Sequence, residues 1–223
     1  MKKFVDRQAA GIILAEHLKK YANQENVIVL ALPRGGVPVA YEIATALSTS
    51  LDVFIVRKLG VPYHEELAMG AIGSGGTIVF NKPLMNLLNM EQKIIDSVLA
   101  VERKELLRRE LLYRGNRSFP TLLDKTIILV DDGIATGATM LAAIKALRKH
   151  KPASIIIAVP VASRATYEDL KTLVDEMVCP LKPINFIAVG LWYENFTQTS
   201  DEEVIELLRQ AHKSFKKCSL GGA

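Results

Sequence analysis

Short apolar runs that do not alternate with polar residues recur along the chain. Five of them are rich in Val, Ile and Leu or Phe: Val27–Leu32, Val53–Val56, Ile127–Val130, Ile155–Val159 and Phe186–Val189. A strand that is buried on both faces of a parallel sheet has no solvent-facing side, so its sequence reads as a continuous apolar run. We therefore predict these five runs as strands of a parallel sheet.

Helical patterns lie before and between these runs. Apolar residues recur at helical spacing from Ala10 to Tyr21, from Val37 to Leu47, and at Met140, Ile144 and Leu147. Strands that alternate with helices in this way are typical of α/β domains. The pattern predicts an α/β fold.

The middle section, about residues 58–120, interrupts this alternation. It begins with several glycines between Gly60 and Gly76, which favour a mobile loop or a glycine-containing hairpin. A long charged helix is predicted from Glu91 to Tyr113, with Glu105 and Arg109 as an i,i+4 ion pair. Its apolar positions form no single stripe, which leaves a homodimer contact open.

The C-terminal part has a simpler pattern. Ser200 and Glu203 form a capping box before a helix whose apolar face contains Val204 and Leu208. We predict a core over residues 1–190, with the loop and helical insertion at about 58–120, and a C-terminal hood and helix over 191–218.

Composition and charge narrow the class of protein. With 223 residues, 49% of them hydrophobic, the chain can bury a sizeable core. The net charge of +4 is too small to point to nucleic acid, and no apolar run approaches membrane-spanning length. Cys179 and Cys218 have no metal-ligand spacing, so reduced thiols and a cytoplasmic location are expected.

The segment from Ile127 to Thr139 contains the candidate chemistry. It is an apolar strand followed by Asp131, Asp132 and a turn of small residues that leads into a helix. A helix N-terminus offers free backbone N–H groups to an anion, and carboxylates accept hydrogen bonds from sugar hydroxyls or hold hydrated Mg²⁺. A phosphate site beside two acids describes a site for a sugar phosphate.

This segment resembles the binding signature for 5-phosphoribosyl-1-pyrophosphate (PRPP) in type I phosphoribosyltransferases, and it matches without departure. The resemblance implies that Asp131 and Asp132 bind the ribose hydroxyls and hold Mg²⁺ through water, and that a loop binds the 5′-phosphate. That loop consists of Ala135, Thr136, Gly137, Ala138 and Thr139. The implied fold is the parallel-sheet type I phosphoribosyltransferase fold with a flexible loop or hairpin and a small C-terminal hood.

Two further segments fit the same resemblance. The first strand ends in Arg34, Gly35 and Gly36, where the family has its pyrophosphate loop, and the second ends in Arg57 and Lys58, which are further cations for pyrophosphate. Together with Leu-Gly-Val-Pro after Lys58, these residues resemble a group of uncharacterised predicted phosphoribosyltransferases. An ordinary strand–helix turn and a surface pair of cations are the simpler interpretations.

The acceptor is less well indicated. Trp192 and Tyr193 lie in the expected hood and are candidates for stacking on a heterocycle, although such aromatic residues are as often part of a core. Many 6-oxopurine enzymes of the family have Asp at the position of Ala135, which argues against a hypoxanthine or guanine acceptor. Adenine, orotate, uracil and other acceptors stay open.

The resemblance implies Mg²⁺-dependent displacement at ribose C1′, with Asp131, Asp132, Arg34 and Lys58 as the catalytic group. An alternative is a regulatory protein that uses the same fold to sense PRPP or a nucleotide, since a fold does not fix a function. A sugar-phosphate hydrolase is a third possibility.

Overall fold

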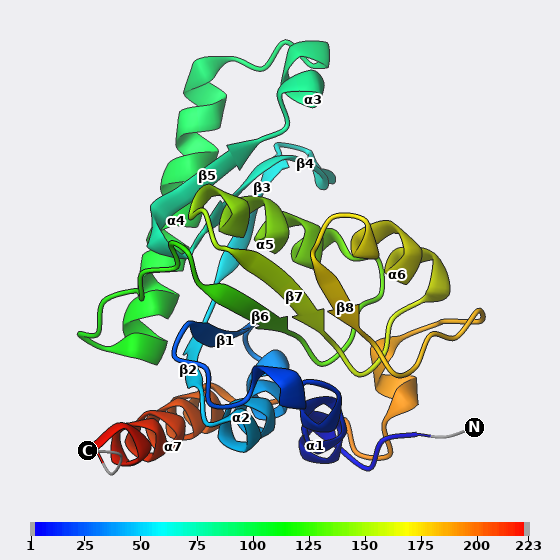
Figure 1. The fold of residues 1–223 in the computed structure, drawn as a ribbon. Helices are drawn as coiled ribbons and strands as arrows, with labels where there is room; N and C mark the ends of the chain where they lie inside the picture. Colours follow the sequence, from blue (N-terminus) through cyan, green and yellow to red (C-terminus); the bar gives the residue numbers. More distant parts are fainter. Residues whose placement is uncertain (1–2, 221–223) are drawn as a thin grey trace. The chain divides into compact units, whose positions relative to one another are not determined.

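Five parallel strands form the sheet at the centre of the first of two units (Figure 1). The computed structural model describes residues 3–220. Unit 1 comprises Met1–Val53, Leu122–Gly137 and Pro152–Ala223, and unit 2 comprises Phe54–Thr121 and Ala138–Lys151. The strands of the parallel sheet are β1 (Val27–Ala31), β2 (Ser50–Val53), β6 (Thr126–Val130), β7 (Ser154–Ala158) and β8 (Glu176–Val178). The predicted α/β fold with a parallel sheet is confirmed.

The order of the strands determines where a ligand can bind. The order is β2-β1-β6-β7-β8, so β1 pairs with β2 on one side and with β6 on the other. After β1, the chain adds β2 on one side of β1 and then adds β6, β7 and β8 on the other side. In open α/β sheets, ligands bind beyond the carboxyl ends of the strands at this reversal point. The fold places such a point between the ends of β1 and β6.

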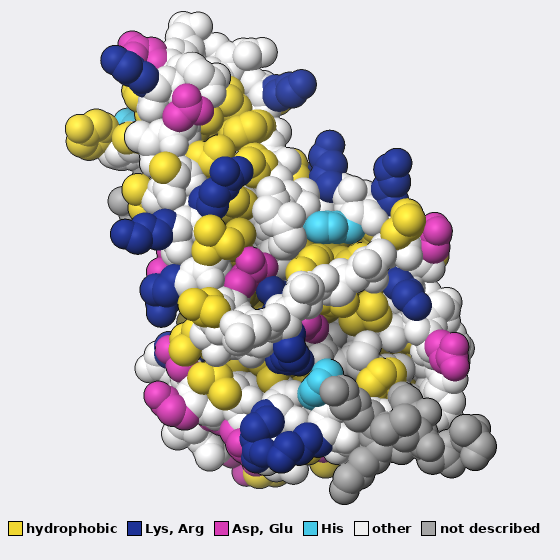
Figure 2. Space-filling model, turned by 90° about the vertical axis from the view of Figure 1, so that its left-hand side faces the viewer, with side chains coloured by type: hydrophobic (Ala, Val, Ile, Leu, Met, Phe, Trp, Pro, Cys, Tyr) yellow, Lys and Arg dark blue, Asp and Glu magenta, His cyan; other side chains and the backbone are white. Residues whose placement is uncertain are grey.

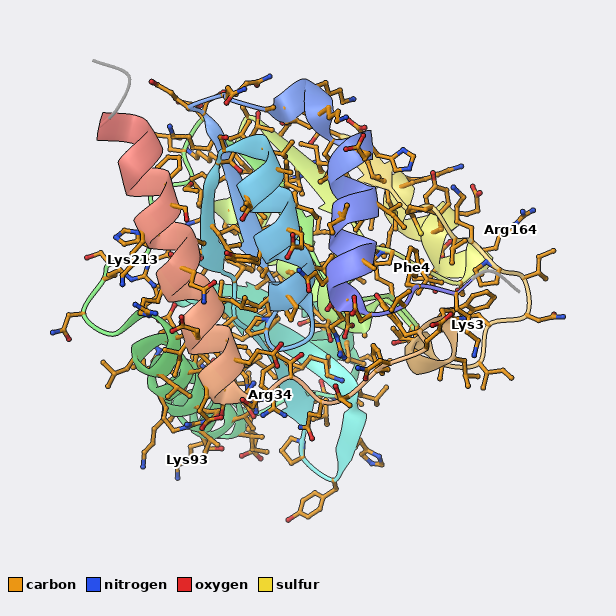
Figure 3. All side chains as sticks on the ribbon, turned by 90° about the horizontal axis from the view of Figure 1, so that it is seen from below. Lys3, Phe4, Arg34, Lys93, Arg164 and Lys213 are labelled. Atoms are coloured by element: carbon orange, nitrogen blue, oxygen red, sulfur yellow. The ribbon has the colours of Figure 1, made fainter. Side chains whose placement is uncertain are left out.

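Helices cover this sheet within unit 1. They are α1 (Arg7–His17), α2 (Gly36–Leu47), α6 (Arg164–Lys171), α7 (Asp201–Leu220) and the 3₁₀ turns η1 (Lys19–Tyr21) and η3 (Val189–Trp192). α2 packs on β1, β2 and β6, and α1 and α7 flank it; Figure 3 shows the three helices side by side. The Asp6 side chain caps α1 by accepting a hydrogen bond of 2.8 Å from the Ala9 N–H. This cap fixes the residue at which α1 begins.

Unit 2 contains an antiparallel sheet and its own helices. Its elements are β3 (Val56–Val61), β4 (His64–Gly73), η2 (Ser74–Gly76), β5 (Thr77–Phe80), α3 (Lys82–Leu87), α4 (Gln92–Arg114) and α5 (Ala138–Lys149). The strand order is β3-β4-β5, and α4 and α5 pack on this sheet. The segment from Leu59 to Gly76 thus contains a hairpin, one of the two predicted forms. The predicted ion pair between Glu105 and Arg109 is confirmed at 2.7 Å.

Two of the five predicted strands are wrong. The run Val53–Val56 includes the end of β2 and the start of β3, and between them Phe54 and Ile55 are buried without being in a strand. The run Phe186–Val189 is not a strand; it leads into η3, and Ile187 is 84% exposed. Both runs are apolar because part of each packs against a core, and packing alone does not produce strand pairing.

The C-terminal part packs on the N-terminal segment. Phe4, Ala10, Val161, Trp192 and Tyr193 form a buried cluster. The Ser200 hydroxyl accepts a hydrogen bond from the Glu203 N–H, which confirms this half of the capping box, and Val204 and Leu208 of α7 are buried as predicted. The division into a core over 1–190 and a hood over 191–218 stays a prediction.

Candidate functional site

The two adjacent acids lie directly after β6, at the reversal point of the sheet. β6 is completely buried, and Asp131 and Asp132 follow its last residue, where the chain becomes half-buried. The Asp132 N–H donates a hydrogen bond of 2.9 Å to Asp131 Oδ1, which holds the Asp131 carboxylate against the backbone of the next residue. The structure therefore presents two carboxyl groups at the carboxyl edge of the sheet.

The turn after β1 packs against these acids. The Leu32 N–H donates to the Val130 carbonyl at 2.9 Å, which holds the ends of β1 and β6 together. A Cβ atom on Gly35 would lie 2.0 Å from Asp132 Oδ2, and one on Gly36 would lie 2.7 Å from the Val130 carbonyl oxygen. Only glycine allows this approach. The peptide bond between Pro33 and Arg34 is cis. Two of the predicted site segments, residues 34–36 and 131–132, are thus brought together.

The turn after the acids is exposed and anchored at its base. The Ile134 N–H donates to the Val161 carbonyl at 2.9 Å, and the Thr166 hydroxyl donates to the Ala135 carbonyl at 2.7 Å. Gly137 has φ 75°, a conformation that favours glycine, and Ala135 and Thr136 are exposed. α5 begins at the next residue, Ala138, with Thr139 also exposed. The N–H groups at the start of a helix have no partner within the helix, so this turn can accept an anion.

Arg7 is a site residue that the sequence analysis missed. Its Nε donates to Asp132 Oδ2 at 2.8 Å, with the two side chains 11% and 14% exposed. Its Nη1 donates to the Thr197 carbonyl at 2.7 Å, and its guanidinium lies 3.9 Å from the centre of the Phe196 ring. Arg7 and Asp132 are 125 positions apart in sequence, and no local pattern connects them. Only the fold brings them together.

Burial controls the protonation of the acids. Burial, reinforced by repulsion from Asp132, raises the pKa of Asp131 well above its usual value. Burial also raises the pKa of Asp132, and the adjacent Arg7 guanidinium opposes this rise. A cation or hydroxyl donors that approach the two carboxyls would favour their ionised forms.

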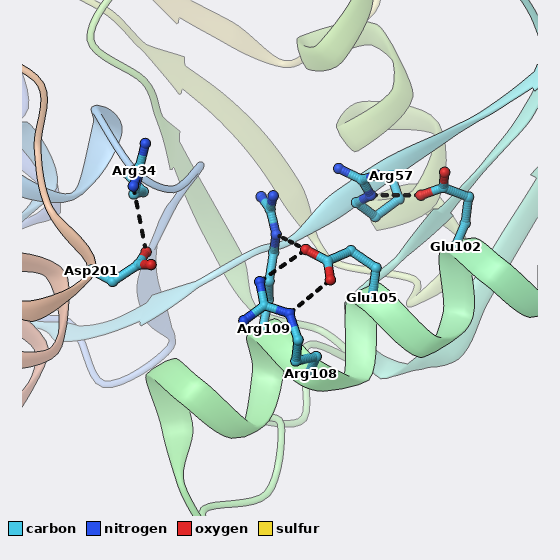
Figure 4. Close-up of polar contacts among 7 residues, drawn as sticks. All are labelled: Arg34, Arg57, Glu102, Glu105, Arg108, Arg109 and Asp201. Carbon is cyan, nitrogen blue, oxygen red and sulfur yellow. Dashed lines mark hydrogen bonds and ion pairs between the residues drawn. The ribbon is translucent and has the colours of Figure 1, made fainter.

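The predicted pyrophosphate cations are distributed between the two units. In unit 1, Arg34 is half-exposed, with Nη1 3.8 Å from an Asp201 carboxylate oxygen (Figures 3 and 4). In unit 2, Arg57 forms an ion pair of 2.6 Å with Glu102 on α4 (Figure 4). Lys58 is exposed and lines a pocket of about 200 Å³ that belongs to unit 2. Arg34 is therefore the one of these three cations whose unit also contains the acids.

The two hood aromatics have protein partners. Trp192 and Tyr193 are 7% and 3% exposed within the cluster described above. The Tyr193 hydroxyl donates a hydrogen bond of 2.5 Å to the Asp132 carbonyl oxygen, and its ring stacks on Phe196 with centres 5.0 Å apart. Stacking of these rings on an acceptor stays a prediction, and it would require the cluster to open.

Asp131 and Asp132 are suited to hold a Mg²⁺ ion together with oxygens of a phosphorylated ligand. Among the described residues, no group of three or more His, Cys, Asp or Glu side chains could hold a metal ion alone. Asp131 and Asp132 supply carboxylate oxygens, and Mg²⁺ is commonly held by one or two carboxylates together with phosphate oxygens and water. The residues therefore fit a Mg²⁺ ion that arrives with a phosphorylated ligand.

The surface and the helices add two observations. Figure 2 shows Lys and Arg side chains dispersed among acidic and apolar ones on the face that it presents. Within residues 3–220, every helix is too short or too polar to cross a membrane.

Comparison with known proteins gives a consistent result. A family model described as "Phosphoribosyl transferase domain" matches residues 4–195. A Mycobacterium tuberculosis protein named "Putative phosphoribosyl transferase", found in strains CDC 1551 and H37Rv, is 44% identical over 218 residues, which is 96% of this chain. The crystal structure of TT1426 from Thermus thermophilus is similar with a TM-score of 0.84 and 40% identity, and the match covers 94% of this chain and 99% of that one. The matched region of the Mycobacterium protein is 48% of its length, so the chain spans about half of these curated relatives.

Proposed function

The chain belongs to the phosphoribosyl transferase family, and we propose that it binds PRPP and transfers the 5-phosphoribosyl group to an acceptor, with release of pyrophosphate. The observation that carries this proposal is the position of Asp131 and Asp132. They lie at the reversal point of the sheet, against the Gly35–Gly36 turn, and only Gly133 and Ile134 separate them from the exposed turn that begins at Ala135.

The ligand fits these groups by its chemistry. The two ribose hydroxyls of PRPP are donors, and the carboxylates of Asp131 and Asp132 are acceptors for them. The 5′-phosphate is assigned to the turn of residues 135–139, whose glycine and exposed hydroxyls permit close approach of an anion. The pyrophosphate is assigned to the Arg34–Gly36 turn. The role of Arg57 and Lys58 as cations for pyrophosphate stays a prediction from the sequence.

The reaction is a displacement at ribose C1′. The acceptor nitrogen forms a bond to C1′ while the bond from C1′ to the pyrophosphate oxygen breaks. The electron pair of the broken bond leaves with the pyrophosphate, and the acceptor nitrogen releases its proton to the solvent. Positive charge develops on the ribose in this step, and the carboxylates next to the ring stabilise it. Arg34 stabilises the negative charge that accumulates on the leaving group. Mg²⁺, when bound with PRPP at the two acids, supplies further charge neutralisation for the pyrophosphate.

The acceptor is proposed only as a class. A nucleobase or related amine supplies the nucleophilic nitrogen for this reaction, and Ala135 in place of an acid argues against a 6-oxopurine. We propose a role in nucleotide metabolism in the cytoplasm, which agrees with Cys179 as a buried free thiol.

A turnover experiment separates this function from its alternatives. The protein is incubated with PRPP, Mg²⁺ and a panel of nucleobases and small amines, and the products are identified by mass spectrometry. We expect a 5-phosphoribosyl adduct of one acceptor together with stoichiometric pyrophosphate. Binding of PRPP without any product would favour the regulatory alternative, and phosphate release without an acceptor would favour the hydrolase.

A further inference from the structure

Asp132 is held at both its side chain and its backbone by one closed set of contacts. Arg7 binds the carboxylate and lies over the Phe196 ring, 2.8 Å and 3.9 Å away respectively. Phe196 stacks on Tyr193, and the Tyr193 hydroxyl returns to the Asp132 carbonyl oxygen at 2.5 Å. All four residues belong to unit 1. These contacts connect the start of α1 and the segment after η3 to Asp132.

The contacts restrict which carboxylate oxygen is available. Oδ2 of Asp132 accepts from Arg7, and the backbone of Gly35 approaches that same oxygen so closely that a Cβ would lie 2.0 Å from it. Oδ1 of Asp132 is therefore the oxygen that can accept a hydrogen bond from a ligand hydroxyl. Since a carboxylate has several acceptor positions, fixing one oxygen orients the other without saturating the group.

We propose that Arg7 is a positioning residue for the ribose site, acting through Asp132. It keeps the carboxylate in the orientation that accepts a ribose hydroxyl and offsets the repulsion between the two adjacent acids. This inference rests on the proposed function, and it assigns a role to a residue outside the signature segment.

The geometry of the side chain explains why this residue is an arginine. Nε and Nη1 donate in different directions, to Asp132 and to the Thr197 carbonyl, while the flat face of the group lies on Phe196. The ammonium group of a lysine carries the same charge, but it has no planar face to lie on Phe196 and cannot reproduce the two fixed donor directions of Nε and Nη1. Arg7→Lys is therefore a test of geometry at constant charge.

The opposite role is also testable. If Arg7 instead occupied Asp132 in competition with the ribose, then removing the guanidinium would strengthen PRPP binding. The two roles predict opposite signs for the same measurement.

A double-mutant cycle tests the proposal by titration calorimetry with two ligands, PRPP and inorganic pyrophosphate, both with Mg²⁺. The variants are Arg7→Gln, Asp132→Asn, the double variant and Arg7→Lys. Arg209→Gln is the matched control, because Arg209 is exposed on α7 and pairs with Glu206 one turn earlier in the same helix. Thermal melts check that each variant is folded.

We expect Arg7→Gln to weaken PRPP binding by about tenfold or more, since a charge-assisted hydrogen bond is lost from Asp132. Pyrophosphate binding should stay within about twofold, and Arg7→Gln should add little in the Asp132→Asn background, because coupled residues are not additive. Arg7→Lys should also weaken PRPP binding, and Arg209→Gln should bind both ligands like the wild type. If Arg7→Gln is unfolded, Phe196→Leu replaces it and should weaken PRPP binding selectively.

Several outcomes would overturn the inference. Unchanged or tighter PRPP binding by Arg7→Gln, equal losses for both ligands, or full additivity with Asp132→Asn would each exclude the positioning role while leaving the proposed function intact. A wild-type protein that does not bind PRPP would overturn the proposed function and this inference with it.

Discussion

Gly35→Ala places a methyl group into the contact between the turn after β1 and the acids. The added Cβ would lie 2.0 Å from Asp132 Oδ2 and 2.6 Å from its Cγ. Gly35 itself has φ −59° and ψ −29°, which alanine adopts freely, so the effect would be purely steric. To reach an ordinary carbon–oxygen distance of roughly 3.4 Å, the carboxylate must move by more than about 1 Å.

The magnitude follows from what that movement disrupts. Overpacking costs about 1–3 kcal/mol of folding free energy, which corresponds to a fall in the melting temperature of roughly 2–12 °C for a chain of this size. Loss of one charge-assisted hydrogen bond to the ribose costs about 1.5–3 kcal/mol, or roughly 10- to 150-fold in Kd for PRPP. Pyrophosphate should be affected less than PRPP, because it has no ribose hydroxyl to donate to Asp132.

Differential scanning fluorimetry and titration calorimetry with PRPP and Mg²⁺ measure the two effects. Gly11→Ala is the control, because its methyl group would lie 2.6 Å from the Val39 carbonyl oxygen and would meet the Glu42 side chain and neither of the acids. It should lower the melting temperature with little change in PRPP affinity. A Gly35→Ala protein with the wild-type melting temperature and affinity would refute the reasoning that this turn and Asp132 are in tight contact.

Three further predictions concern other parts of the chain. Arg34→Ala should weaken the binding of pyrophosphate and PRPP about tenfold but leave the binding of ribose 5-phosphate unchanged, as measured by calorimetry. Arg209→Ala is the exposed control, and equal losses for all three ligands would contradict a role of Arg34 toward the leaving group. We predict that the hairpin over residues 59–76 closes over bound PRPP, so its amide hydrogens should exchange more slowly when PRPP and Mg²⁺ are present. Amide hydrogens that are already fully protected without ligand would exclude this closure. Burial raises the pKa of Cys179 to about 12, so the reactive thiolate is scarce at pH 8. Iodoacetamide should therefore modify Cys179 only when urea unfolds the protein, as measured by peptide mass spectrometry. Labelling of Cys179 in the native protein would contradict this prediction.

The sequence predicted the parts of the fold whose signal is local. β1, β6 and β7 were identified because strands buried on both faces leave uninterrupted Val and Ile runs. β2 begins with Ser50-Leu51-Asp52, and β8 has only three residues, Glu176–Val178, so polar residues and short length concealed both.

The candidate site shows the same division. Asp131, Asp132 and the turn after them are contiguous, and their order along the chain is itself the signal. Arg7 comes from the first helix and meets Asp132 only because α1 packs against α2 in the folded chain. Tyr193 was noticed as an aromatic residue, but its hydrogen bond to the Asp132 carbonyl depends on the same packing. Contacts of this kind need the fold.

Calorimetric titration of PRPP with Mg²⁺ into the wild type and into the Asp131→Asn/Asp132→Asn variant tests the central claim most directly. Asparagine preserves the size of both side chains and removes their charge, and Asp169→Asn on the exposed surface of α6 is the matched control. We predict saturable binding by the wild type and by the control, and a loss of about 1.5–3 kcal/mol per acid in the double variant, which would still melt cooperatively. Wild-type protein that gives no heat with millimolar PRPP, or a double variant that binds PRPP as tightly as the wild type, would contradict the account.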